Sequence, residues 1–114
     1  MSTVSMSLDA IYALAHDTMT SNGCDEANAA ALADIVMRAE RDGSHSHGLF
    51  RVPGYVKALR SGKVDGKAKP TVTKKTPAVV HVDGDGCFAP LAQAVGLPVL
   101  AEATEEIGVA ALSL

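Results

Sequence analysis

The sequence contains no tryptophan, two tyrosines and two phenylalanines, so aromatic residues make up only 4% of it. A core must therefore be built from alanine, valine, leucine and isoleucine. The two cysteines, Cys24 and Cys87, lie far apart with no C-x-x-C spacing, which fits a reducing cytosol better than a disulfide framework. No apolar run approaches the ~20 residues that a membrane span needs, and the first residues lack the basic and apolar regions of a signal peptide. We therefore expect a cytoplasmic protein with no membrane partner.

The charge of the chain is low and evenly spread. With 10 Lys or Arg and 13 Asp or Glu, the formal net charge is −3, and no basic run stands out. The lysines between positions 63 and 75 are scattered among glycine, proline and threonine, which is typical of a solvated loop rather than of a nucleic-acid patch. We expect no nucleic-acid partner, and at 114 residues the chain is long enough for a real core.

The first half of the chain has the pattern of a helical segment, and residues 1–62 are predicted to form one. Ser7 and Asp25 are suitable N-caps, and apolar residues recur at helical spacing behind each of them. Pro53 is tolerated only near the start of a helix, where its missing N–H matters little. The three expected helices run from Ser7 to Asn22-Gly23, from Asp25 to Gly43, and from near Ser46–Gly48 to Ser61-Gly62.

Residues 63–114 are predicted to form a connecting arm and the start of an α/β cofactor-binding region. The turn Asp83-Gly84-Asp85-Gly86 fits neither a calcium loop nor the G-x-G-x-x-G pattern of a Rossmann site. The chain stops inside an apolar strand, which needs a neighbour, so we expect either a fragment or a second chain that covers it. The expected elements are extended pieces in 63–77, a strand at 78–82, a helix at 88–106 with a kink or break at 96–98, and a buried strand at 109–114.

The stretch from Asp42 to Val56 carries the residues best suited to chemistry. If a helix begins around Ser46, His47 and Arg51 lie one turn apart on the same face, followed by Tyr55. Arginine can hold a substrate carboxylate with two parallel hydrogen bonds. Histidine titrates near neutrality and can donate a proton beside that clamp, with Ser46 bonded to its ring or to the reacting atom. The constellation suits reduction of a small 2-keto or 2-imino acid.

Other interpretations of this stretch remain open. A polar loop with a satisfied histidine and a surface arginine would show the same residues. A metal site on His45 and His47 needs further ligands, and none of the other histidines or cysteines has a motif spacing to this pair, so we predict no metal. Glu40 or Asp42, at the charged end of the second helix, either brace the histidines or belong to a solvated helix end.

The run from Glu40 to Val56 resembles the N-terminal signature of the malate/L-lactate (sulfolactate-type) dehydrogenase family. The doubled Ser-His pair, the Phe-Arg-Val-Pro-Gly-Tyr run and the run from Val64 to Ala68 look most like its Δ1-piperideine-2-carboxylate/Δ1-pyrroline-2-carboxylate reductase branch. The resemblance implies a non-Rossmann α+β fold in which N-terminal helices precede the first strands of a mostly antiparallel sheet. It also implies an NADPH or NADH cofactor and a homodimer. Family members are much longer than this chain, so the cofactor-binding residues are expected mostly beyond Leu114.

The resemblance also implies residue roles. His47 matches the catalytic proton donor, Ser46 its hydrogen-bonding partner in a relay, and Arg51 the residue that binds the substrate carboxylate. The predicted function is therefore the N-terminal part of an NAD(P)H-dependent reductase that forms L-pipecolate or L-proline from the cyclic imino acid. The alternatives are a malate- or lactate-type 2-hydroxy acid dehydrogenase, or a catalytically silent fragment competent only for association.

Overall fold

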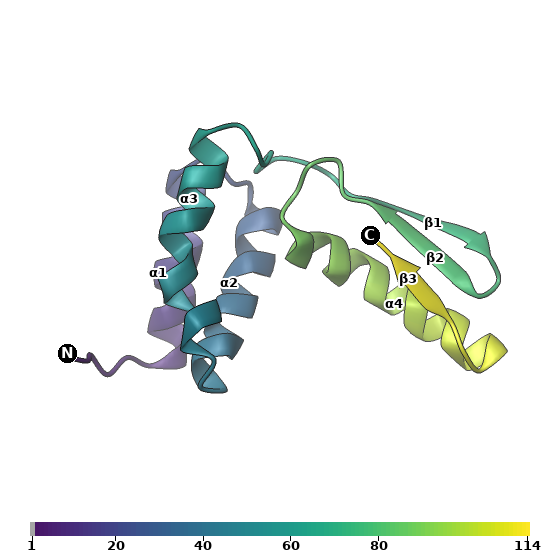
Figure 1. The fold of residues 1–114 in the computed structure, drawn as a ribbon, viewed down its shortest axis with the longest axis horizontal. Helices are drawn as coiled ribbons and strands as arrows, with labels where there is room; N and C mark the ends of the chain where they lie inside the picture. The colour runs from purple at the N-terminus through teal and green to yellow at the C-terminus, as the bar shows by residue number, and fades with distance from the viewer. Residues whose placement is uncertain (1) are drawn as a thin grey trace.

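The computed structural model describes residues 2–114, which form an elongated molecule of two lobes (Figure 1). Its extents are 50 × 30 × 20 Å, and its radius of gyration is 15.7 Å, whereas a compact domain of this length would have a radius of about 13 Å. One lobe contains helices α1 to α3, and the other contains helix α4 with the strands. The elements are α1 (Leu8–Ser21), α2 (Glu26–Arg41), 3-10 turns at His45–His47 and Leu49–Arg51, α3 (Val52–Arg60), β1 (Thr71–Thr76), β2 (Val79–Asp83), α4 (Ala89–Ile107) and β3 (Ala111–Ser113).

Helices α1 and α2 begin at the predicted caps. The Ser7 hydroxyl accepts from the Ala10 N–H at 3.1 Å, and an Asp25 carboxylate oxygen accepts from the Asn28 N–H at 3.0 Å. Each cap satisfies a backbone donor that the first helical turn leaves without a partner. The buried faces of the two helices pack against each other and bury Ile11, Ala15, Met19, Ala29, Leu32, Ala33 and Val36.

The predicted start of α3 near Ser46 is wrong, because the α-helix begins at Val52. Gly48 has φ −93° and ψ −136°, which is not helical and separates the two 3-10 turns. Pro53 lies in the first turn of α3. Deeper inside a helix its ring would clash with the carbonyl four residues earlier, so an α-helix from Ser46 would be broken at this point.

The second lobe is a three-stranded mixed sheet in the order β1-β2-β3, with α4 packed against it. Strands β1 and β2 pair antiparallel, and β2 and β3 pair parallel, with Val79 opposite Ala111. The predicted strand at 78–82 is confirmed as β2, and the extended pieces of the arm include β1. The predicted helix at 88–106 is confirmed as α4, which continues through Pro98 without a break and ends at Gly108, where φ is +93°.

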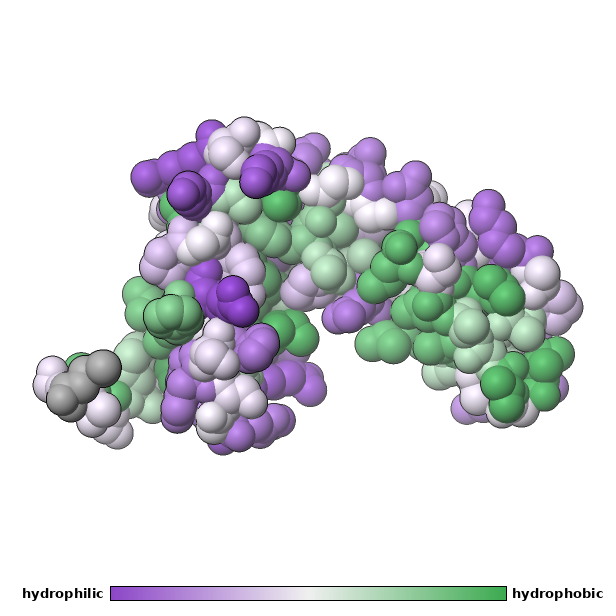
Figure 2. Space-filling model, viewed as in Figure 1, coloured by the Kyte–Doolittle hydropathy of each residue, from purple (hydrophilic) through white to green (hydrophobic). Residues whose placement is uncertain are grey.

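The prediction that residues 109–114 form a buried strand is wrong in part. Strand β3 forms, but it spans three residues at the edge of the sheet, and Val109 is 79% exposed. Figure 2 shows apolar surface over much of this lobe, whose exposed large apolar side chains are Val79, Leu97, Ile107, Val109 and Leu114. Within residues 2–114, no helix is long and apolar enough to cross a membrane.

The two lobes are joined by more than the chain itself. Phe88, directly before α4, is buried in the core of the helical lobe and meets Tyr55 edge-on at a centroid distance of 5.5 Å. The buried Asn28 donates from Nδ2 to the Ala68 carbonyl at 3.1 Å, and the Asp25 N–H donates to the Gly66 carbonyl at 2.8 Å. Residues beyond 63 therefore help to complete the helical lobe, and the predicted division between residues 62 and 63 stays a prediction.

Candidate functional site

The candidate site is the segment from Ser44 to Arg51, which connects α2 to α3 and which we call the histidine loop. Its backbone is held by short turns: the His47 N–H donates to the Ser44 carbonyl at 2.9 Å, and the Arg51 N–H donates to the Gly48 carbonyl at 2.9 Å. At its start, the Ser44 N–H donates to the Ala39 carbonyl in the last turn of α2 at 2.8 Å. The loop is thus a fixed continuation of α2, although most of its side chains are exposed.

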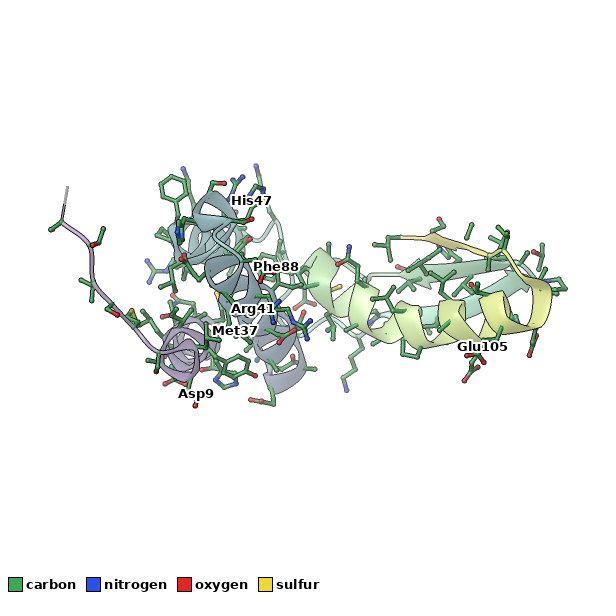
Figure 3. All side chains as sticks on the ribbon, turned by 90° about the horizontal axis from the view of Figure 1, so that it is seen from below. Asp9, Met37, Arg41, His47, Phe88 and Glu105 are labelled. Carbon is green, nitrogen blue, oxygen red and sulfur yellow. The ribbon has the colours of Figure 1, made fainter. Side chains whose placement is uncertain are left out.

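The loop places Ser46 and His47 in direct contact. The Ser46 Oγ lies 3.0 Å from the Nδ1 atom of His47, within hydrogen-bonding distance. Figure 3 shows His47 at the border of the helical lobe, on the opposite side from Asp9. The serine contact occupies the Nδ1 edge of the ring, and His47 is an exposed residue.

Arg51 is held beside this pair by its own backbone contact. Its Nε donates to the carbonyl oxygen of Ser46 at 3.0 Å, so the guanidinium is anchored next to His47. Within residues 2–114 the two terminal nitrogens form no hydrogen bond, and together they can present two parallel N–H groups to a carboxylate. The assumption of one α-helical face carrying both residues is wrong, because two 3-10 turns connect them. Tyr55, expected on the same face, packs against Phe88 instead.

Glu40 reaches into the loop from the last turn of α2. Its Oε1 accepts from the Leu49 N–H at 2.9 Å, and its Oε2 lies 2.6 Å from the Nδ1 of His45. The hydrogen bond from His45, followed by that from the Leu49 N–H, holds the pKa of the Glu40 carboxyl below its usual value. Asp42 does not take part, since its carboxylate pairs with the Arg41 guanidinium at 2.7 and 3.1 Å. Of the two proposed braces, only Glu40 touches the loop.

The two histidines of the histidine loop contact different groups. The ring of His45 faces Glu40, whereas the Nδ1 of His47 faces Ser46, so the two imidazoles have different partners. Across residues 2–114, no group of three His, Cys, Asp or Glu side chains converges to hold an ion.

The turn before α4 does not fit the phosphates of a dinucleotide. Asp83 and Asp85 lie on it, and the Asp83 carboxylate accepts from the Asp85 N–H at 2.9 Å. Two carboxylates at this turn would repel a pyrophosphate, although a helix start otherwise favours anions. We therefore assign no phosphate contact to this turn.

The comparison with known proteins identifies the family. A model described as malate/L-lactate dehydrogenase matches residues 6–114. The chain belongs to this family. Its relatives include a Δ1-pyrroline-2-carboxylate reductase from Ancylobacter novellus, which is 46% identical over 111 residues, a match that covers 97% of this chain and 33% of the relative.

Solved structures of the malate/L-lactate dehydrogenase family show the same arrangement. The Δ1-piperideine-2-carboxylate reductase from Pseudomonas syringae pv. tomato has a TM-score of 0.92 and 40% identity, over 96% of this chain and 33% of that chain. The sulfolactate dehydrogenase from Methanocaldococcus jannaschii has a TM-score of 0.84 and 25% identity, over 94% and 31% of the two chains. The predicted family and the sulfolactate dehydrogenase-like fold class are confirmed. The chain spans about a third of the length of these relatives.

The sequence did not reveal two features of the site. One is the role of Gly48, whose Cβ position would overlap the carboxylate of Glu40. The other is the anchoring of Arg51 by the Ser46 carbonyl. Both depend on the backbone path of the 3-10 turns, and the spacing of residues in the sequence does not predict that path.

Proposed function

We propose that the protein containing this chain is an NAD(P)H-dependent oxidoreductase of cyclic 2-imino acids. It would reduce Δ1-pyrroline-2-carboxylate or Δ1-piperideine-2-carboxylate to L-proline or L-pipecolate. The names of the relatives support this substrate class, because a pyrroline- and a piperideine-2-carboxylate reductase match nearly the whole chain. NADPH or NADH supplies the hydride that adds to the imine carbon, and we expect its binding residues mostly beyond Leu114.

The observation that carries the proposal is the joint placement of Ser46, His47 and Arg51 on the histidine loop. When the Ser46 hydroxyl donates to Nδ1, the neutral imidazole of His47 carries its proton on Nε2. We assign to this proton the protonation of the imine nitrogen, which becomes the ring amine as the carbon is reduced. Ser46 holds the ring in that tautomer and orientation.

Arg51 is the proposed carboxylate clamp. Its Nε is already bonded to the Ser46 carbonyl, so the substrate carboxylate would be held end-on by the two terminal nitrogens. This arrangement links the position of the substrate to that of the proton donor through a single residue, Ser46. Correct placement of the reacting groups relative to each other can account for a large part of the rate acceleration by an enzyme.

A second candidate is a malate- or lactate-type 2-hydroxy acid dehydrogenase. The description of the matched family and the similarity to sulfolactate dehydrogenase favour it. The same three residues would serve it, with a carbonyl oxygen in place of the imine nitrogen. Assays with the cyclic imines on one side and with pyruvate, oxaloacetate or sulfopyruvate on the other separate the two functions.

The test uses a grafted enzyme in which residues 6–114 replace the matching third of the Pseudomonas syringae reductase. We expect turnover of the cyclic imine, and we expect His47→Ala to reduce it at least a hundredfold, since general acid catalysis contributes roughly 10²–10⁴. Arg51→Lys should mainly raise the KM, by about tenfold or more, because an ammonium cannot form the bidentate clamp. The matched control is His16→Ala, remote from the loop. A folded graft in which His47→Ala turns over normally contradicts the proposal.

We further propose that the complete enzyme is a cytoplasmic homodimer of imino acid and proline metabolism. The family resemblance supports this assembly. A split enzyme, in which a second chain supplies the rest of the fold, is the alternative, and native mass spectrometry of the purified protein distinguishes the two by the masses of the subunits. A chain that associates but neither binds cofactor nor reduces any of these substrates would instead be the catalytically silent fragment.

A further inference from the structure

Glu40 occupies an electrostatically unfavourable position. It lies in the last turn of α2, where the helix dipole disfavours an anion. Its side chain is only 17% exposed, so the carboxylate is also partly withdrawn from water. A residue chosen for helix stability alone would be neutral or basic here. Within residues 2–114, the hydrogen bonds of the carboxylate come from the histidine loop, namely from His45 and from the Leu49 N–H.

The two bonds of Glu40 flank the proposed proton donor. His45 lies two residues before His47, and Leu49 lies two residues after it, so both ends of this short stretch are tied to one carboxylate. His47 itself lies between these two residues, and within residues 2–114 Ser46 is the hydrogen-bond partner of its ring. Glu40 thus holds the side chain of His45 and the backbone at Leu49, in addition to the turn that holds the His47 N–H.

Gly48 allows the loop backbone to approach the carboxylate of Glu40 closely. It is buried, and a Cβ at this position would overlap the carboxylate of Glu40. The space at this position therefore leaves no room for a side chain while the carboxylate of Glu40 keeps its place. The loop backbone is in contact with the carboxylate between the two bonded residues, which leaves little freedom to shift.

We propose that Glu40 is a positioning residue that sets the place of His47 through the histidine loop, with Gly48 as its steric counterpart. The catalytic meaning of this positioning rests on the proposed function. The positioning itself is a structural property of the chain and can be measured without any activity. The lowered pKa of Glu40 agrees with it, because the carboxylate that makes both bonds stays ionised at neutral pH.

The first experiment measures the loop directly in the 114-residue chain by NMR. Glu40→Ala removes both bonds, whereas Glu40→Gln keeps an oxygen for the Leu49 N–H but loses the charge. We expect hydrogen exchange of the Leu49 amide to accelerate roughly tenfold or more in Glu40→Ala and less in Glu40→Gln, since hydrogen bonds to charged groups are the stronger ones. The ring signals of His47 should shift in the same order. Asp42→Asn is the matched control, because within the described residues the Asp42 carboxylate pairs with Arg41 and not with the histidine loop.

A double-mutant cycle tests the steric part. Gly48→Ala should displace the loop and shift the His47 signals while Glu40 is present, and the shift should shrink when Glu40→Ala has made room. Additive effects of the two substitutions, or a Leu49 amide and a His47 ring unchanged in Glu40→Ala, overturn the proposal.

The grafted enzyme separates this proposal from the proposed function. Glu40→Gln should lower kcat, because the proton donor is displaced, and should also raise KM, because the Ser46 carbonyl that anchors Arg51 lies on the same stretch; Asp42→Asn should change neither. If the graft is active and His47→Ala removes activity, but Glu40→Gln behaves as the parent, positioning by Glu40 is refuted and the proposed function stands. If His47→Ala is fully active while the NMR shifts occur, the proposed function is refuted and the structural positioning stands.

Discussion

His16 lies on α1 between two acidic partners and shows how one side chain couples stability to pH. Its Nε2 is 2.7 Å from Glu26 and its Nδ1 is 3.2 Å from Asp17. The hydrogen bond to Asp17, followed by that to Glu26, raises the pKa of the imidazole above its ordinary value of 6.5. Both carboxylates are well exposed, so solvent screens these pairs and they contribute little stability.

We therefore predict that His16→Ala destabilises the chain more at low pH than at high pH, with a pH-dependent part of less than about 1 kcal/mol. A pKa raised on folding means that the native state holds the proton more tightly than the unfolded state. The stabilisation is fully present below pH 6.5 and is lost as the pH rises through the higher folded-state pKa. Urea unfolding of both proteins at pH 5.5 and at pH 8.5 checks this. A larger loss at pH 8.5 than at pH 5.5 would contradict it.

At the scale of the elements, two glycines differ in the space around their Cβ positions. Gly66, in the arm, packs closely against the helical lobe: a Cβ there would lie 2.7 Å from the Gly23 carbonyl oxygen and 3.0 Å from the Cα of Cys24. Those atoms belong to the backbone and cannot turn aside. Gly54, in the first turn of α3, has no atom within 4 Å of its Cβ position.

We predict opposite effects for the two alanine substitutions. Gly66→Ala should cost roughly 1–3 kcal/mol through overpacking and displacement of the arm. Gly54→Ala should be neutral or stabilise by up to about 1 kcal/mol, because alanine is the better helix former. Thermal and urea unfolding of both variants measure this. A Gly66→Ala protein as stable as the parent would show that the arm is not in close contact with the helices.

The sequence predicted those elements whose signals are local. One or two residues determine where such an element begins or ends. The predicted caps of α1 and α2 and the predicted end of α4 at Gly108 are confirmed for this reason. The start of α3 depends on Gly48 and Pro53 together, which separate the 3-10 turns from the α-helix. The spacing of His47 and Arg51 was equally compatible with a continuous α-helix. Which acid braces the loop was also open, because Glu40 and Asp42 are about 200° apart around a helix and only the fold shows which side faces the loop.

At the scale of the whole molecule, the sheet lobe has much uncovered apolar surface. Val109 is 79% exposed and Ile107 52% exposed, both beside the edge strand β3. An open strand edge with apolar neighbours is a surface for association. The predicted burial of residues 109–114 failed here because burial needs a neighbour on the far side of β3, and an amino-acid pattern does not say whether one is present.

We predict that the 114-residue chain associates in a concentration-dependent way through this lobe. Val109→Lys should weaken the association by about tenfold, because burying one valine side chain is worth roughly 1.5 kcal/mol. Leu14→Lys is the control: Leu14 is 49% exposed, but it lies on α1 in the other lobe. Sedimentation equilibrium and native mass spectrometry give the dissociation constants. Equal weakening by both variants would place the contact elsewhere.

The position of Phe88 in the sequence affects the order in which the two lobes can fold. The three helices are synthesised before this residue, yet its ring fills the core they share and meets Tyr55. During synthesis the helical lobe is therefore an unfinished bundle with a gap where the ring will lie, and a ring-sized gap is costly. The nascent chain must hold this half-built state until the arm and both strands of the hairpin have emerged. The lobe made first is thus stabilised by a residue made late, so the two lobes are expected to mature together rather than one after the other.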